Sequence, residues 1–310
     1  MPTTVQATKL TKRYDSFVAV NDLSLQVEEG EVFGFLGPNG AGKTTTILML
    51  LGLTVPSSGE ARVLGFDPSR EPLKVKRQAG YLPENLGLYG DLRGEDNLRY
   101  IARLNGLDSN EATRKTAEVL ELVGMTRAAR QRVETYSRGM KQRLSLAGVL
   151  LKSPKVVFLD EPTSGLDPEG ARAILDLITH MSREQKMTVF ISSHLLYQVQ
   201  QICHRMGIIS QGRLVAQGTL EDLGKLAMGT GRTVVEVEMA NVPASLPATL
   251  KTIGGVTNVQ VSGASLLIEC SADCRPKVAQ RVAESGGQLL GMRTRGYGLD
   301  EVYHKYFGEA

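Results

Sequence analysis

A glycine-rich stretch between a predicted strand and a predicted helix constrains this chain more than any other feature. Residues 37–45 read GPNGAGKTT and fit the pattern G-x-x-x-x-G-K-[ST]. The apolar residues 32–36 before the stretch are typical of a buried strand, and residues 44–51 after it are typical of a helix. Because glycines let backbone N–H groups converge on an anion at a helix N-terminus, the stretch predicts a phosphate-binding loop.

Every residue of this predicted loop is a candidate for contact with a nucleotide. We expect the Lys43 ammonium to reach the β- and γ-phosphates and the Thr44 hydroxyl to bind Mg²⁺. A glycine-rich turn without a ligand is the alternative, but the strand and the helix around the loop are the context that the pattern requires. The candidate binding residues are Gly37, Pro38, Asn39, Gly40, Ala41, Gly42, Lys43, Thr44 and Thr45.

Two adjacent carboxylates follow another predicted buried strand, residues 156–160. A parallel sheet would bring Asp160 and Glu161 to the edge where the phosphate loop opens. We expect Asp160 to hold Mg²⁺ and Glu161 to poise the water that attacks the γ-phosphate. Such a pair alone is often a solvated helix start. Beside a phosphate loop it predicts a hydrolytic site, as in many P-loop ATPases.

Strands that alternate with helices predict an α/β fold with a mainly parallel central sheet. Residues 32–36, 156–160 and 188–192 read as buried strands, each followed by a helical pattern. Residues from about 85 to 152 carry three helical patterns and no strand-like run. The sequence therefore predicts a P-loop NTPase core with an inserted helical subdomain.

The last third of the chain has a different pattern. The three glycines within residues 224–231 predict a linker. Beyond it, the order β, α, β, β, α, β predicts a small ferredoxin-like α+β domain. We therefore predict two domains, residues 1–228 and 229–310. The second has no phosphate, metal or nucleophile motif.

Charge and hydropathy limit the possible partners. Lys and Arg number 36 against 33 Asp and Glu, a net charge of +3, and they are scattered, so we expect no nucleic-acid partner. The basic clusters at 74–77 and 127–132 read as solvated helix faces. The apolar stretches 47–53 and 144–151 are far shorter than the ~20 residues that cross a bilayer. No signal-peptide pattern opens the sequence, so any membrane role requires a partner.

The cysteines predict neither a disulfide framework nor a zinc site. Cys203, Cys270 and Cys274 are odd in number and lack CxxC spacing. We expect three reduced thiols.

A further motif narrows the class of ATPase. Residues 136–143 read YSRGMKQR about twenty residues before Asp160, and they resemble the signature of the ATP-binding-cassette (ABC) family. Residues 164–167 (SGLD), His194 and Tyr14 follow the same family order. The resemblance covers roughly residues 3–225. It implies the ATP-hydrolysing subunit of an ABC transporter, with ATP and Mg²⁺ as cofactors.

The resemblance also implies roles and partners. Tyr14 would stack on adenine, Ser137 and Gly139 would bind the γ-phosphate of the nucleotide held by a second copy, and His194 would position that phosphate. In isolation, Tyr14 reads as an aromatic residue of a strand, Ser137 as a helix N-cap and His194 as a polar residue at a helix start. The implied partners are a second copy and integral-membrane permease subunits, with the protein cytoplasmic and peripheral on the inner face of the cell membrane.

The chain departs from the family pattern at two places. Glu84 stands where the family usually has Gln, so we expect it to bind Mg²⁺ as part of the catalytic site, although a carboxylate cannot donate a hydrogen bond to water. Arg138 and Met140 replace the common Gly and Gln of the signature. These forms, with a tail at 299–303 like that of exporter ATPases, favour export.

Two other functional classes compete with this interpretation. Soluble ABC ATPases that act on ribosomes or DNA carry two cassettes or a long coiled coil, and this chain shows neither pattern. A regulator that does not hydrolyse ATP would be expected to lack Asp160 or Glu161. For the small domain, a dimer-stabilising or permease-regulating surface is preferred to a ligand site.

Overall fold

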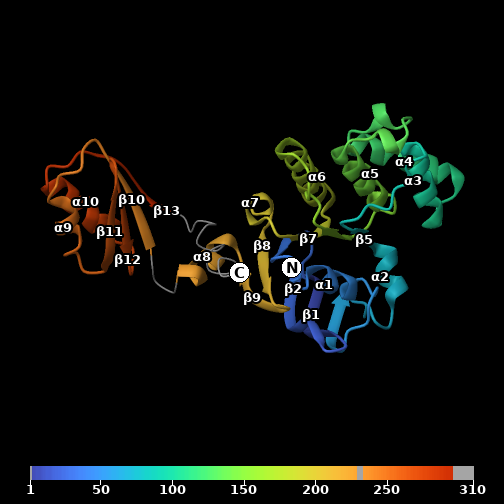
Figure 1. Ribbon diagram of the computed structural model, residues 1–310, viewed down its shortest axis with the longest axis horizontal. Helices are drawn as coiled ribbons and strands as arrows, with labels where there is room; N and C mark the ends of the chain where they lie inside the picture. The colour runs from blue at the N-terminus through green and yellow to red at the C-terminus, as the bar shows by residue number, and fades with distance from the viewer. Residues whose placement is uncertain (1, 229–232, 296–310) are drawn as a thin grey trace. The chain divides into compact units, whose positions relative to one another are not determined.

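The chain falls into two compact units in the computed structural model, which describes residues 2–228 and 233–295 (Figure 1). We call Met1–Thr219 unit 1 and Leu220–Ala310 unit 2. Within the described residues, no helix combines the length and the apolar character needed to cross a membrane.

Unit 1 is built on a six-stranded sheet in the order β5-β6-β7-β3-β8-β9. All neighbouring strands are parallel except the pair β8 and β9, which is antiparallel. The strands are β3 (Val32–Leu36), β5 (Ala79–Leu82), β6 (Val156–Asp160), β7 (Thr188–Ser193), β8 (Arg205–Ser210) and β9 (Arg213–Gly218). Every residue of β3, β6 and β7 is buried, as expected for parallel strands covered on both faces. The predicted α/β fold is confirmed.

A second sheet of unit 1 was not predicted from the sequence. It is antiparallel in the order β2-β1-β4, with β1 at Thr3–Tyr14, β2 at Phe17–Glu28 and β4 at Ser58–Val63. Helix α1 (Lys43–Leu50) shares one hydrophobic core with strands of both sheets. This packing fixes the direction in which the N-terminus of α1 points.

The region from 85 to 152 is helical in the structure. Apart from an isolated bridge between Arg93 and Arg132, its described residues contain no strand pairing. Helix α4 begins at Ser109 because the Asp108 carboxylate accepts hydrogen bonds from the backbone N–H of Asn110 and Glu111, each at 2.9 Å. The remaining helices of unit 1 are α2 (Pro72–Gln78), α3 (Gly94–Leu104), α4 (Ser109–Leu122), α5 (Arg138–Leu150), α6 (Pro168–Gln185) and α7 (Leu196–Val199), with 3-10 turns at Thr126–Ala128 and Val133–Thr135.

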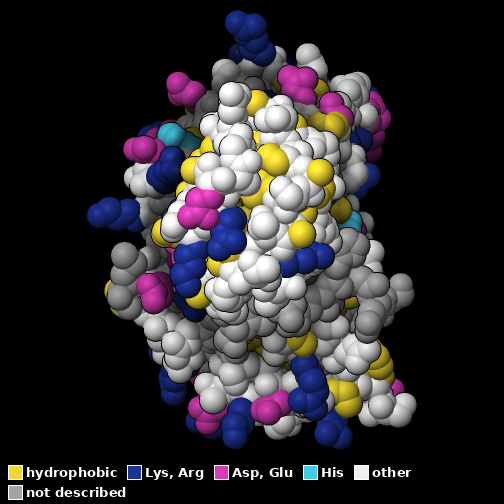
Figure 2. All heavy atoms as spheres, turned by 90° about the vertical axis from the view of Figure 1, so that its left-hand side faces the viewer, with side chains coloured by type: hydrophobic (Ala, Val, Ile, Leu, Met, Phe, Trp, Pro, Cys, Tyr) yellow, Lys and Arg dark blue, Asp and Glu magenta, His cyan; other side chains and the backbone are white. Residues whose placement is uncertain are grey.

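Unit 2 contains an antiparallel sheet in the order β11-β12-β10-β13, with α9 and α10 on one face. This strand order, combined with the order β, α, β, β, α, β along the chain, is a ferredoxin-like arrangement. Its elements are α8 (Leu220–Met228), β10 (Thr233–Met239), α9 (Leu246–Leu250), β11 (Val256–Ser262), β12 (Ser265–Cys270), α10 (Arg275–Glu284) and β13 (Leu289–Arg295). On the face seen in Figure 2, hydrophobic side chains lie among uncharged ones, with Lys and Arg side chains beside them.

Two predictions for the last third of the chain concern the linker and the second domain. The predicted linker is wrong for residues 224–228, which belong to helix α8, because good helix formers there outweigh the single Gly224. Residues 229–231 and the tail at 299–303 lie outside the described residues. The assignment of residues 229–310 as a separate domain stays a prediction.

The expectation of three reduced thiols is wrong for two of them. Cys270 and Cys274 form a disulfide, with their Cα atoms 6.2 Å apart, and Cys203 is free. Cys270 ends β12 and Cys274 is the N-cap residue of α10, so the short turn between the two elements brings the sulfur atoms together. An odd cysteine count does not exclude one local pair.

Candidate functional site

The predicted phosphate loop joins β3 to α1 at the carboxyl edge of the parallel sheet. Gly40 and Gly42 have φ of +79° and +105°, which side chains rarely allow, and a Cβ on Gly37 would clash with the backbone oxygen of Ile209. Helix α1 has no side-chain hydrogen bond at its N-cap and no acidic residue in its first turn. Its first N–H groups therefore fit an anionic ligand such as a nucleotide phosphate.

Lys43 is buried beneath this loop. Its ammonium donates hydrogen bonds to the carbonyl oxygens of Gly37 (2.8 Å) and Pro38 (3.2 Å). It also lies 3.2 Å from Oε1 of Glu161. Lys43 thus contacts both the phosphate loop and the carboxylate of Glu161.

Asp160 is held by hydroxyl groups from two other elements. The Thr44 hydroxyl donates a hydrogen bond to Oδ2 of Asp160 at 2.7 Å, and the Ser192 hydroxyl donates one to Oδ1. Asp160 is buried. Burial of Tyr81, together with the negative charge of Asp160, raises the pKa of Tyr81 to about 12. An acidic oxygen beside a threonine hydroxyl is a donor set that suits Mg²⁺.

Glu161 is the strained residue of the site. Its φ is +51°, and its N–H donates to the backbone oxygen of Ser192 at 3.1 Å. Nδ1 of His194 lies 2.9 Å from Oε2 of Glu161. Oε1 is buried and, within the described residues, accepts no hydrogen bond despite the nearby Lys43. One carboxylate oxygen is therefore held by His194, and the other, buried oxygen faces the Lys43 ammonium.

Apart from loop residues 37–42 and 45, the structure brings together five of the predicted site residues and leaves four apart. The joined residues are Lys43, Thr44, Asp160, Glu161 and His194. Within the described residues, no hydrogen bond or ion pair connects this cluster to the other four. Those four, from three separate parts of unit 1, are Tyr14, Glu84, Ser137 and Gly139.

Each of the four lies at an accessible position. Tyr14, at the end of β1, is 45% exposed, with the Lys12 ammonium 4.9 Å from its ring centre. Glu84 is exposed after β5. The Ser137 hydroxyl accepts a hydrogen bond from the Met140 N–H at 3.2 Å as the N-cap of α5, and a Cβ on Gly139 would meet open space.

Sequence reasoning missed Ser192 as a member of the site. Its hydroxyl donates to Asp160, and its backbone oxygen accepts from the Glu161 N–H. The available signal was the pair of serines that ends the apolar strand β7, at the same sheet edge as Asp160. Polar residues that end a fully buried strand are candidates for a role at that edge.

This fold and site define a P-loop NTPase: a parallel sheet whose phosphate loop, buried lysine and two strand-end carboxylates meet at one edge. Comparison with known proteins then narrows the class. Residues 20–164 match the family described as ABC transporter. The chain belongs to the ATP-binding proteins of ABC transporters. It is an ATPase subunit, as the sequence predicted.

Two relatives and one solved structure illustrate the similarity. The chain is 36% identical over 274 residues to the linearmycin resistance ATP-binding protein LnrL of Bacillus subtilis, covering 88% of this chain and 87% of that protein. It is 40% identical over 225 residues to the bacitracin transport ATP-binding protein BcrA of Bacillus licheniformis, covering 73% and 72%. Its fold matches cbiO1 of Clostridium perfringens, part of the cbiONQ complex, with a TM-score of 0.66, 27% identity, and coverage of 71% and 89%.

Proposed function

We propose that this ATPase works as an ATP-sandwich homodimer and powers export through separate permease subunits at the cytoplasmic face of the cell membrane. The observation that carries the proposal is the division of the site within one chain. Lys43, Asp160 and Glu161 lie together, whereas in the described part of the chain no hydrogen bond or ion pair joins Ser137 to them. A second copy would supply the missing signature.

Within one protomer, the joined residues divide the work of hydrolysis. The loop N–H groups and Lys43 would bind the phosphates, and Thr44 and Asp160 would hold Mg²⁺, which would neutralise charge on the phosphate oxygens. Oε1 of Glu161 would orient the attacking water, while His194 fixes the other oxygen of the same carboxylate. Phosphoryl transfer requires this kind of positioning rather than a covalent intermediate.

The signature would act on the nucleotide of the second copy. Ser137 and Gly139 lie at the N-terminus of α5, with open space around Gly139. The N–H groups there and the Ser137 hydroxyl suit a γ-phosphate presented by a partner. Tyr14 is exposed enough to stack on adenine, and Glu84 would add a carboxylate oxygen to Mg²⁺.

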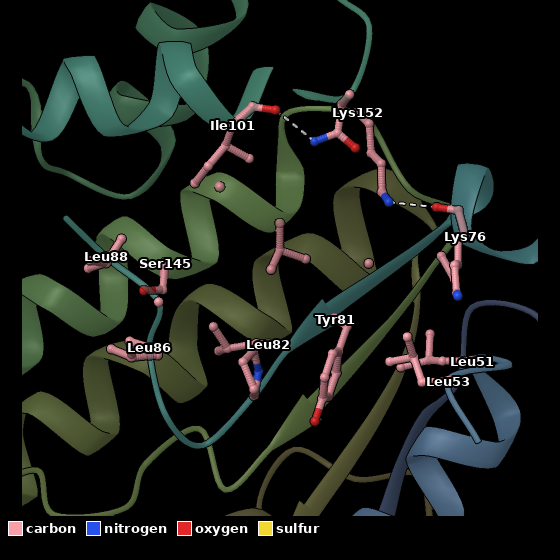
Figure 3. A pocket seen from close by; sticks show the side chains of 17 residues that line it. Leu51, Leu53, Lys76, Tyr81, Leu82, Leu86, Leu88, Ile101, Ser145 and Lys152 are labelled. Atoms are coloured by element: carbon pink, nitrogen blue, oxygen red, sulfur yellow. Dashed lines mark hydrogen bonds between the residues drawn. The ribbon is translucent and has the colours of Figure 1, made fainter. Parts of the chain in front are cut away.

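A cavity within unit 1 supports a permease contact. It has a volume of about 370 Å³ and is lined by β5, the segment that follows it, α3 and α5 (Figure 3). Its apolar side chains include Leu82, Leu86 and Ile101, and the Lys152 ammonium donates to the backbone oxygen of Lys76 at 2.6 Å. Tyr89 and Tyr100 are exposed nearby and form an edge-to-face pair at 5.3 Å. An apolar helix end of a permease fits such a surface.

The proposed direction rests on the relatives and on the signature form. Two of the relatives are described as acting in linearmycin resistance and bacitracin transport, and a third as a probable multidrug transporter protein. These descriptions agree with the exporter-like form of residues 136–143. For unit 2 we propose a dimer-stabilising or permease-regulating surface, because none of its described charged side chains is buried.

Complementation tests the composite site. Chains carrying Lys43→Ala or Ser137→Arg should each be inactive as homodimers, because both of their sites contain the defect. Random mixing makes about half of the dimers heterodimeric, each with one intact site, so ATP hydrolysis should recover to about a quarter of wild type if the sites act independently.

The same mixture can also contradict the proposed composite site. ATP-dependent dimer formation should be followed beside hydrolysis, with the permease present. If the mixed sample neither dimerises nor hydrolyses ATP faster than the single variants, Ser137 does not act on the partner's nucleotide.

A further inference from the structure

The side chain of Arg138 lies flat against Gly165. A Cβ built on Gly165 would fall within 2.6 Å of Cζ and both Nη atoms of Arg138. Because the three atoms are at similar distances, the guanidinium plane faces the glycine. Any residue with a side chain at 165 would displace it. Gly165 has φ +66° in the segment 164–167, which we call the post-strand loop.

Charge does not explain this placement. In the part of the chain that the structure describes, the Arg138 guanidinium takes part in no hydrogen bond or ion pair, and the residue is exposed. Arg138 is the first residue of α5, which has no acidic side chain in its first turn. The helix dipole disfavours a cation at that end. The contact with Gly165 is thus one of shape, between a planar group and bare backbone.

The post-strand loop leads back to Glu161 through two turns. The Ser164 N–H donates to the Glu161 backbone oxygen at 3.1 Å, and the Leu166 N–H donates to the Thr163 oxygen at 3.3 Å. The Thr163 hydroxyl is buried and donates to Gln198 at 2.7 Å. A displacement at Gly165 would therefore reach the backbone of Glu161, whose φ is already unfavourable.

We propose that Arg138 is a positioning residue: by packing on Gly165 it sets the distance between the N-terminus of α5 and the post-strand loop, and thereby the placement of Glu161. The inference rests on the proposed hydrolytic role of Glu161. It assigns a task to a residue at which this chain departs from the common signature. Movement of α5 changes the position of the Glu161 carboxylate, which orients the attacking water, through this contact.

Steady-state ATP hydrolysis by the full chain tests whether Arg138 affects the rate of hydrolysis. Arg138→Gly should lower kcat about tenfold and change the KM for ATP by less than about twofold, because the phosphate loop is untouched. Arg138→Lys should behave like Arg138→Gly, since an ammonium keeps the charge but has no flat face to pack. Wild-type kcat in Arg138→Lys would show that charge alone matters and would overturn the proposal.

A double substitution tests the contact itself. Gly165→Asn should lower kcat about tenfold by displacing the guanidinium, since Asn adopts positive φ more readily than most residues. In the Arg138→Gly background the same change should have no further effect. Gly286→Asn, at φ +72° with open space around it, is the matched control and should behave as wild type. If the double variant lowers kcat by the product of the two single effects, the proposal is overturned.

Amide hydrogen exchange separates this inference from the proposed function. Arg138→Gly should speed exchange of the Ser164 and Leu166 N–H groups about tenfold in the full chain without nucleotide, with no change in unit 2. Unchanged exchange at these two amides contradicts the contact even if hydrolysis is slow. If Arg138→Gly speeds exchange but the wild-type chain hydrolyses no ATP, the contact stands. That result would instead contradict the proposed function and, with it, the catalytic part of this inference.

Discussion

Unit 1 buries ionisable side chains against one another, whereas the described ion pairs of unit 2 lie at its surface. Lys43 and Glu161 are 6% and 8% exposed and only 3.2 Å apart. In unit 2, hydrogen bonds from Arg275 lower the pKa of Asp273 to about 2, yet these side chains are 46% and 50% exposed. Surface pairs of this kind contribute little to stability.

The two sheets explain this contrast. The parallel sheet of unit 1 is covered on both faces, so polar residues collect where its strands end, and Asp160, Glu161 and Ser192 meet there. The antiparallel sheet of unit 2 buries one side of each strand, as Val235 and Val237 show, and its other side chains reach solvent. The difference teaches that, within the described residues, the buried ion pair of Lys43 and Glu161 lies at the edge of the parallel sheet.

The largest expected effect comes from removing the carboxylate that orients the attacking water. Glu161→Gln should lower kcat about a thousandfold and leave ATP binding intact, because Lys43 keeps its bonds to Gly37 and Pro38. Nucleotide titration and single-turnover hydrolysis measure the two quantities. Glu238→Gln, an exposed carboxylate of β10, is the control and should change neither. Equal losses in both variants would break the contrast between the units.

A smaller effect is expected at Glu84, whose role as a Mg²⁺ ligand is proposed from the sequence. Glu84→Ala should raise the Mg²⁺ concentration for half-maximal hydrolysis about tenfold and reduce transport more than ATP binding. Magnesium titrations of ATPase activity decide this, with Glu238→Ala as the control. An unaltered titration curve would exclude Glu84 as a ligand.

The smallest effect on catalysis is expected from the disulfide of unit 2. Reduction of Cys270–Cys274 should lower the stability of unit 2 by about 2 kcal/mol, because it frees a very short loop of the unfolded chain. Thermal unfolding with and without reductant measures the change, and a Cys274→Ser variant should not respond. ATP hydrolysis should be the same in both conditions. A change in kcat on reduction would show that unit 2 acts on the site.

The sequence alone predicted the elements whose signal is local. A strand, a glycine-rich loop and a helix in succession identified residues 37–45, and a buried strand that ends in two carboxylates identified Asp160 and Glu161. The ferredoxin-like element order of unit 2 was also readable from alternating apolar residues and turns. The first two patterns each lie within about thirty residues, the length of one supersecondary unit.

The tertiary structure decided what distant segments do together. Thr44 and Asp160 are 116 positions apart, and Ser192 reaches Asp160 from a neighbouring strand. The antiparallel sheet of β1, β2 and β4 and the contact of Arg138 with Gly165 likewise left no signal that single segments could reveal. Local sequence sets backbone preference and the kind of side chain. Which side chains meet depends on strand order and packing, and these are fixed only when the whole core closes.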